Sequence, residues 1–168
     1  GGAGAYAYNG GPGTLFLWSA SETNGSLYSA GNNVTNDVRR AFVTSGTALV
    51  FDDIYLTAST TLAIATSTSV SITSSTIGRN TVTSTLEVMG TLTMPTAFTV
   101  PTYLKMIAST TAISGVSDLR VDGLLEVRNS NTSTALSLNS LYVVGEMVHS
   151  NASSTTNYST LTISAVSS

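Results

Sequence analysis

The sequence is poor in charged residues. Lys, Arg, Asp and Glu make up 9% of its 168 residues, against roughly 25% in an average soluble domain. The six Lys and Arg residues are scattered, and the formal net charge is −3. A nucleic-acid-binding protein needs a clustered basic face, so we expect no nucleic-acid partner.

Cysteine is missing altogether, so disulfides contribute nothing to stability. Long apolar runs are missing too, because none approaches the roughly 18–20 residues of a membrane-spanning helix. We therefore expect no membrane span. We also expect a chain that is stabilised by backbone pairing and by a packed core.

Helix signals are nearly absent, since almost no segment repeats apolar residues at intervals of three and four. Apolar and polar residues instead alternate with the period of two that is typical of a β-strand. Ser and Thr supply about a third of the chain, and such side chains suit the outer face of a sheet. The composition predicts an all-β protein.

An eight-residue repeat runs through residues 54–72. Its members are apolar pairs: Ile54 with Leu56, Leu62 with Ile64, Val70 with Ile72 and, after a break, Leu86 with Val88. The spacing predicts short strands, each with one inward-facing pair, separated by polar corners. Three such strands would close a turn of about 24 residues.

A second repeat has the form L-x-V-x-G-x-L. Copies begin at Leu86, Leu119 and Leu141, and a degraded copy begins at Leu161, so the spacings are 33, 22 and 20 residues. The last two are the size of one solenoid coil, and the first predicts an insertion or an extra partial coil. In each copy we expect Leu and Val to point inward and Gly to turn the chain at a crowded corner.

Together, the repeats predict a parallel β-helix (β-solenoid) with irregular coils of about 20–24 residues; a β-sandwich is the alternative. Pro95 and Pro101 predict a loop or an irregular edge near residues 95–111. Charged side chains fall at outward positions, namely Glu87, Arg120, Asp122, Glu126, Arg128 and Glu146.

The chain divides by composition at residue 45. Residues 1–45 form a Gly- and Tyr-rich opening segment with the first strands, which we interpret as a cap or a first coil. Residues 46–168 carry the repeats, and the stretch YSTLTISAVSS ends in mid-pattern. We expect the repeats to continue or to pair beyond residue 168, with Leu161, Ile163 and Val166 as a self-association strand.

Few side chains are candidates for chemistry. Asp52 and Asp53 are candidates for a calcium site, although hard cations need several oxygen ligands and a polar corner is the plainer interpretation. His149 is the only histidine, and we expect it exposed at a strand end rather than catalytic, because no nucleophile motif accompanies it. Without recurring carboxylate pairs, we expect no enzyme and no cofactor beyond calcium.

Aromatic residues gather near the N-terminus. Trp18, Tyr6, Tyr8 and Tyr28 are candidates for a platform that binds sugars, because the face of an aromatic ring covers the apolar face of a pyranose. The same residues would also serve to plug the end of a solenoid core.

Three segments carry a resemblance to known proteins. NGGPGTLFLWS at residues 9–19, followed by TALVFDDIYLTASTTLAI and copies such as LEVMGTLTM, resembles large bacterial surface proteins and adhesins with parallel β-helix segments. The Ser/Thr-rich style is similar to that of surface proteins from small-genome candidate-phylum bacteria. The resemblance implies an extracellular or cell-surface location and no catalytic residues.

We therefore expect a structural extracellular module of a bacterial surface protein, serving as stalk, adhesin segment or self-assembling fibre subunit. The alternative is a carbohydrate-binding module that uses the N-terminal aromatics. Expected partners are a second copy, neighbouring segments of a longer chain, or cell-surface glycans.

Overall fold

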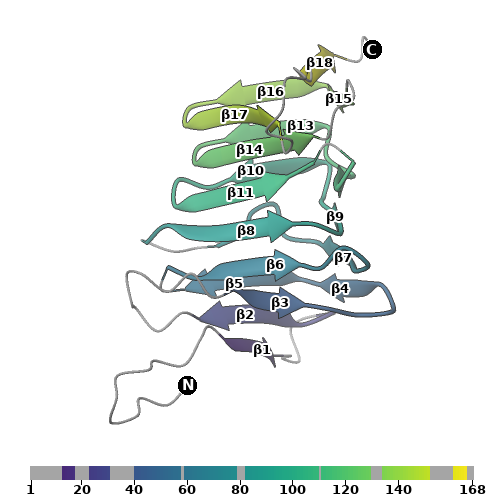
Figure 1. Cartoon of the computed structure of the whole chain (residues 1–168), viewed down its shortest axis with the longest axis vertical. Helices are drawn as coiled ribbons and strands as arrows, with labels where there is room; N and C mark the ends of the chain where they lie inside the picture. Colours follow the sequence, from purple (N-terminus) through teal and green to yellow (C-terminus); the bar gives the residue numbers. More distant parts are fainter. Residues whose placement is uncertain are drawn as a thin grey trace.

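Parallel strands stacked along one axis make up the structure, a computed structural model (Figure 1). It describes residues 13–17, 23–30, 40–57, 59–78, 82–109, 111–129, 134–151 and 161–165. These residues form eighteen strands and no helix, so none of the described segments is a helix able to cross a membrane. The predicted β-solenoid is confirmed, and the alternative β-sandwich is wrong.

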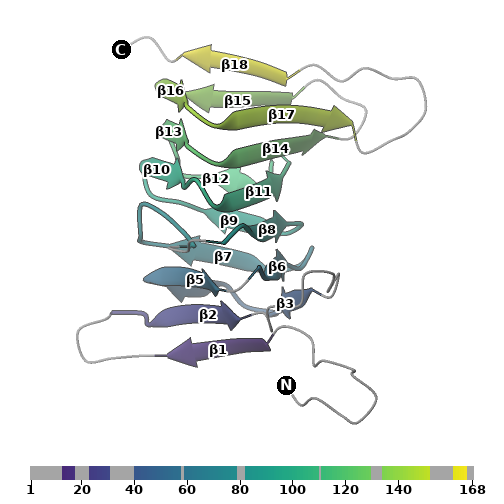
Figure 2. The same ribbon diagram turned by 90° about the vertical axis from the view of Figure 1, so that its left-hand side faces the viewer.

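Successive strands belong to three faces that follow one another around each coil (Figure 2). Between residues 72 and 84 the described residues form only a single bridge on the first face, from Thr76 to Thr99, in place of a strand. The first face holds β1 (Gly13–Leu17), β2 (Ser26–Ala30), β5 (Asp53–Thr57), β10 (Ala97–Val100), β13 (Asp118–Val121) and β16 (Ser140–Val143). The second face is one sheet of β3 (Ala41–Val43), β6 (Thr61–Ile64), β8 (Ser84–Val88), β11 (Leu104–Ala108), β14 (Leu124–Asn129) and β17 (Glu146–Asn151). The third face holds β4 (Leu49–Phe51), β7 (Ser69–Ile72), β9 (Thr91–Thr93) and β12 (Ile113–Ser114). In the last coils, β15 (Thr134–Leu138) and β18 (Leu161–Ala165) follow the second-face strands instead and form a separate two-stranded sheet.

The N-terminal end departs from this regular order. β1 lies antiparallel on β2, whereas β2 pairs in parallel with β5. The coil made by β2, β3 and β4 runs across residue 45, so the opening segment supplies strands to the same faces as the repeats that follow. β1 thus lies outside the first full coil.

The eight-residue repeat is confirmed. Its first three pairs fall in β5, β6 and β7, which follow one another around a single coil. β6 then pairs with β8, so that Leu62 meets Leu86, 24 residues further along the chain. At Gly78, where the series breaks, the backbone N–H still donates to the carbonyl of Ile54 (3.1 Å) with a φ of 67° that glycine adopts freely.

Inward-facing residues stack on one another from coil to coil. One row of the second face runs through Ala41, Leu62, Leu86, Met106, Leu125 and Met147, and the next through Val43, Ile64, Val88, Ala108, Val127 and His149. Leu62, Ile64 and Leu86 are fully shielded from solvent, and this burial is the main source of stability in a chain without disulfides. His149 occupies an inward row and is half-buried, which corrects the exposed strand-end position expected for it.

Glycines turn the chain at crowded corners, as the second repeat predicts. A Cβ on Gly123 would collide with the backbone oxygens of Pro101 and Leu104 in the preceding coil. A Cβ on Gly90 or Gly145 would meet backbone oxygens of a neighbouring coil in the same way. The close approach of two coils, rather than an unusual φ, excludes side chains at these corners.

The uneven spacing of the second repeat reflects a change of corner. The copy at Leu86 joins β8 to β9, whereas the copies at Leu119 and Leu141 join the first face to the second. The spacing of 33 residues therefore includes a partial coil, as predicted. The final spacing of 20 is not a full coil, because Leu161 opens β18, two strands after β16, and pairs with β15.

The prediction of a loop or an irregular edge near residues 95–111 is wrong. β10 lies between Pro95 and Pro101 and pairs along its whole length with β13, and β11 follows directly. Both prolines stand outside the strand, where the missing N–H removes no bond from the ladder. They mark corners of a regular coil.

Replacing Gly123 with Ala should destabilise the fold by about 2 kcal/mol or more, because the new methyl group overlaps backbone that cannot move alone. Urea unfolding at neutral pH measures the change. Gly46→Ala is the matched control, since its Cβ would have no atom within 4 Å. Equal stability of the two variants would refute the crowded-corner explanation.

Candidate functional site

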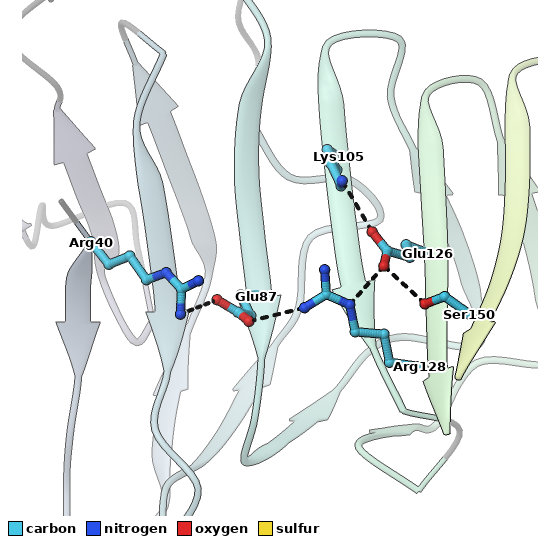
Figure 3. A network of polar contacts seen from close by, with 6 residues as sticks. All are labelled: Arg40, Glu87, Lys105, Glu126, Arg128 and Ser150. Carbon is cyan, nitrogen blue, oxygen red and sulfur yellow. Dashed lines mark hydrogen bonds and ion pairs between the residues drawn. The ribbon is translucent and has the colours of Figure 1, made fainter. Parts of the chain in front are cut away.

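A network of ion pairs crosses the outer side of the second face (Figure 3). Glu87 on β8 contacts Arg40, which precedes β3, at 2.9 Å and Arg128 on β14 at 3.5 Å. Glu126 accepts from Arg128 Nε (2.6 Å), Lys105 Nζ (3.0 Å) and Ser150 Oγ (2.9 Å). The contacts link four of the six strands of this face, and the residue before β3, and Arg128 reaches across β11 to Glu87.

The network lies over apolar residues on the outer side. The strand register places Ala63 beside Glu87, and Ile107 between Glu87 and Glu126, in one outward row. Ala63 is fully buried and Ile107 is 7% exposed. We infer that the long charged side chains cover these two residues with their aliphatic stems.

Three donors converge on Glu126 and favour its charged form. The hydrogen bond from Arg128 is the largest influence, opposed by burial and reinforced by Lys105 and Ser150. Together they lower the pKa of Glu126 from 4.5 to about 2. A carboxyl whose pKa is lower in the folded state stabilises the fold above its unfolded pKa.

Acid should therefore weaken the wild-type protein. Its free energy of unfolding should fall as the pH drops from about 4.5 to about 2, where the Glu126 carboxylate is protonated. Glu126→Gln should be less stable at neutral pH and lose less on acidification, measured by urea unfolding at several pH values. Glu146→Gln, at an exposed position, is the control, and an unchanged acid response in Glu126→Gln would contradict the assignment.

Asp52 forms hydrogen bonds that hold the turn before β2 against the solenoid. Its carboxylate accepts hydrogen bonds from the backbone N–H groups of Thr23 (2.7 Å) and Asn24 (2.9 Å). The Asn24 amide (3.0 Å) and the Thr73 hydroxyl (3.2 Å) add two more. These bonds, led by that from the Asn24 backbone, lower the pKa of Asp52, so this corner favours a carboxylate.

Asp53, its neighbour, is 4% exposed and accepts a hydrogen bond from the N–H of Ile54 (2.8 Å). In the described part of the chain, no three His, Cys, Asp or Glu side chains gather as a metal site. The carboxylate of Asp52 already has protein donors, and calcium binding at Asp52 and Asp53 stays a prediction.

The predicted glycan platform is only partly described. Tyr28 stacks on Tyr55, with ring centroids 4.5 Å apart and planes 13° from parallel, so the partner ring takes one face of each. Trp18, Tyr6 and Tyr8 lie outside the described residues. Glycan binding by Trp18, Tyr6, Tyr8 and Tyr28 stays a prediction.

An open groove of about 320 Å³ lies along β10, β13 and β16; we name it the first-face groove. Among its lining residues are Thr99, Asp118, Arg120, Ser140 and Tyr142. Arg120 pairs with Asp122 through Nε (2.8 Å), which raises the pKa of Arg120. Its guanidinium carbon also lies 5.0 Å from the centre of the Tyr142 ring, a cation–π contact.

Exposed apolar side chains gather at the two ends of the described solenoid. Of ten large ones that are exposed among the described residues, four form an N-terminal patch, Phe16, Leu17, Phe42 and Val50, and two form a C-terminal patch, Val143 and Val144. An open pocket of about 410 Å³ lies within the N-terminal patch, between β1, β3 and β4. Both ends therefore leave apolar surface uncovered.

Val143 shows why the C-terminal patch is exposed. It pairs with Val121 in an inward row, yet Val143 is 42% exposed while Val121 is fully buried. Among the described strands, none stacks on the far side of β16. Val143 thus belongs to a core row that no further described strand covers.

The predicted self-association strand takes part in the fold. Leu161 and Ile163 belong to β18, which pairs in parallel with β15, and Val166 lies outside the described residues. Pairing of this strand with a second copy would have to use the edge of β18 opposite β15. That association stays a prediction.

Comparison of the chain with protein-family models, with curated proteins and with solved structures found no match in any of the three. The resemblance to bacterial surface proteins therefore rests on the sequence pattern alone.

Several important residues carry no clear sequence signal. The alternation places Glu87, Glu126 and Arg128 outward, but it does not identify Arg40 or Lys105 as their partners. Those contacts depend on strand register across coils. The sequence does not single out Tyr142 for the same reason: Arg120, 22 positions earlier in the chain, lies beside it only because the chain between them closes a coil.

Proposed function

We propose that this chain is a structural, self-associating module of a bacterial surface protein, located outside the cell as a stalk, adhesin segment or fibre subunit. The observation that carries the proposal is the gathering of exposed apolar residues at the two ends. Large exposed apolar patches mark interaction sites. Ends of this kind favour further coils, supplied by a second copy or by neighbouring segments of a longer chain.

The sides of the solenoid support the same proposal. The parallel ladder of the second face is continuous over six strands, and the ion pairs of Glu87 with Arg40 and Arg128 each reach across an intervening strand. A rod built in this way resists bending and local opening, because each coil is held by its neighbours. Such a rod suits a load-bearing or spacing role.

The extracellular location rests on composition and resemblance. A chain without cysteine does not depend on disulfides, and a surface rich in Ser and Thr stays hydrated with few charges. The proposal includes no catalytic activity, since the groups that could do acid–base chemistry, such as Glu126, are held in ion pairs.

Replacing an end residue with Glu should weaken self-association, because a charge would be buried at the contact between two ends. We expect wild-type protein to form concentration-dependent oligomers or filaments, and Val144→Glu and Val50→Glu to shift them at least about tenfold toward monomer. Sedimentation velocity and electron microscopy measure this. The two valines to be replaced are exposed, Val50 by 46% and Val144 by 58%, and so is the control residue Val82, by 42%.

Val82→Glu is the matched control, because Val82 is a similarly exposed valine away from both end patches. It should assemble like the wild type. Wild-type protein that stays monomeric at every concentration, or an equal loss of assembly in Val82→Glu, would contradict the proposal.

A further inference from the structure

The first-face groove combines groups that no other described outer surface brings together. Tyr142 is 59% exposed, the largest exposed fraction among the large apolar and aromatic side chains of the described residues. Around it, the register aligns Thr99, Arg120 and Tyr142 in one outward row. Asp118 and Ser140 stand in the adjacent row of the same strands.

The polar groups of the groove retain capacity to bind. Asp118 accepts hydrogen bonds from Ser140 Oγ (2.8 Å) and Ser117 Oγ (3.2 Å), and a carboxylate has about four acceptor positions. Arg120 uses Nε for Asp122. The four N–H groups on its terminal nitrogens make no hydrogen bond among the described residues, so the groove offers both acceptors and donors.

Charge narrows the class of ligand. Asp118 and Asp122 outweigh Arg120 by one negative charge, so an anionic ligand would meet net repulsion. A cationic ligand packed on the Tyr142 ring would be repelled by the positive guanidinium of Arg120 beside that ring. A neutral ligand with many hydroxyls and one apolar face satisfies the donors, the acceptors and the ring together.

We propose that the first-face groove binds a neutral glycan, with a pyranose packed on Tyr142 and its hydroxyls bonded to Asp118 and Arg120. Neighbouring strands lie about 4.8 Å apart, and alternate residues of one strand about 6.7 Å apart. The two outward rows therefore present polar groups along the coil axis, which suits a linear chain of sugars. This binding function is independent of self-association at the ends.

The other outer surfaces lack this combination. Ion pairs occupy the outward side of the second face. On the third face, the outward row of Val50, Ser71, Thr93 and Ser114 has no aromatic ring. The Tyr28 and Tyr55 rings stack on one another and are half-buried. Tyr103 is 45% exposed but lies between β10 and β11, outside the groove lining, which makes it a matched control.

The test is isothermal titration calorimetry of the full chain with neutral hexasaccharides of glucose, xylose, mannose and N-acetylglucosamine, and with hexagalacturonic acid as an anionic comparison. We expect at least one neutral hexasaccharide to bind more tightly than the acid. Tyr142→Ala should weaken that binding at least about tenfold, as loss of an aromatic contact does. Asp118→Ala should weaken it, whereas Tyr142→Phe and Tyr103→Ala should stay within about twofold of the wild type.

Circular dichroism melting of each variant identifies any variant that has lost its fold, and Tyr142→Phe then reports on the ring in a folded protein. The inference is overturned if no neutral hexasaccharide binds, if hexagalacturonic acid binds best, or if Tyr142→Ala and Tyr103→Ala bind alike. None of these results bears on assembly through the end patches, which Val144→Glu tests separately.

Discussion

The parallel hydrogen-bond ladder between successive coils is the constraint on which the rest of the structure depends. Because its register sets inward residue on inward residue, Leu62 stacks on Leu86 and Ile64 on Val88, and each row becomes a continuous core. The backbones of neighbouring coils also approach closely at the corners, so that a corner such as Gly123 has no room for a side chain. Core packing and corner composition are thus two consequences of one repeated distance between strands.

The ladder also decides what the outer faces can do. It brings residues about twenty positions apart in the chain side by side, so isolated charges gain partners. On the second face the result is a chain of ion pairs through Glu87 and Glu126, which lies over the buried side chains of Ala63 and Ile107. On the first face the same geometry leaves Tyr142 exposed and places Asp118 in the lining of an open groove. This difference separates a stabilising surface from a candidate binding surface.

A solenoid ladder has no natural stopping point, which makes the ends the least satisfied part of the molecule. Inward residues of the final coil, such as Val143, keep the pattern of the core but lack a neighbour to cover them. β1 partly covers the other end by pairing antiparallel with β2, and an apolar pocket remains beside it. A chain whose sides are hydroxyl-rich and whose ends are apolar is suited to extension along its axis.

The sequence by itself determined the all-β class, the eight-residue spacing of the short strands in residues 54–72 and the glycine corners, because these depend on local alternation and on sterics. It misplaced the loop near Pro95 and Pro101, since a proline just outside a strand looks the same in sequence as one that ends pairing. Only the tertiary structure decided which corner each repeat occupies, that His149 faces inward, and which acid meets which base. The physical reason is register, which is set by the stacking of whole coils and by no single segment of the chain.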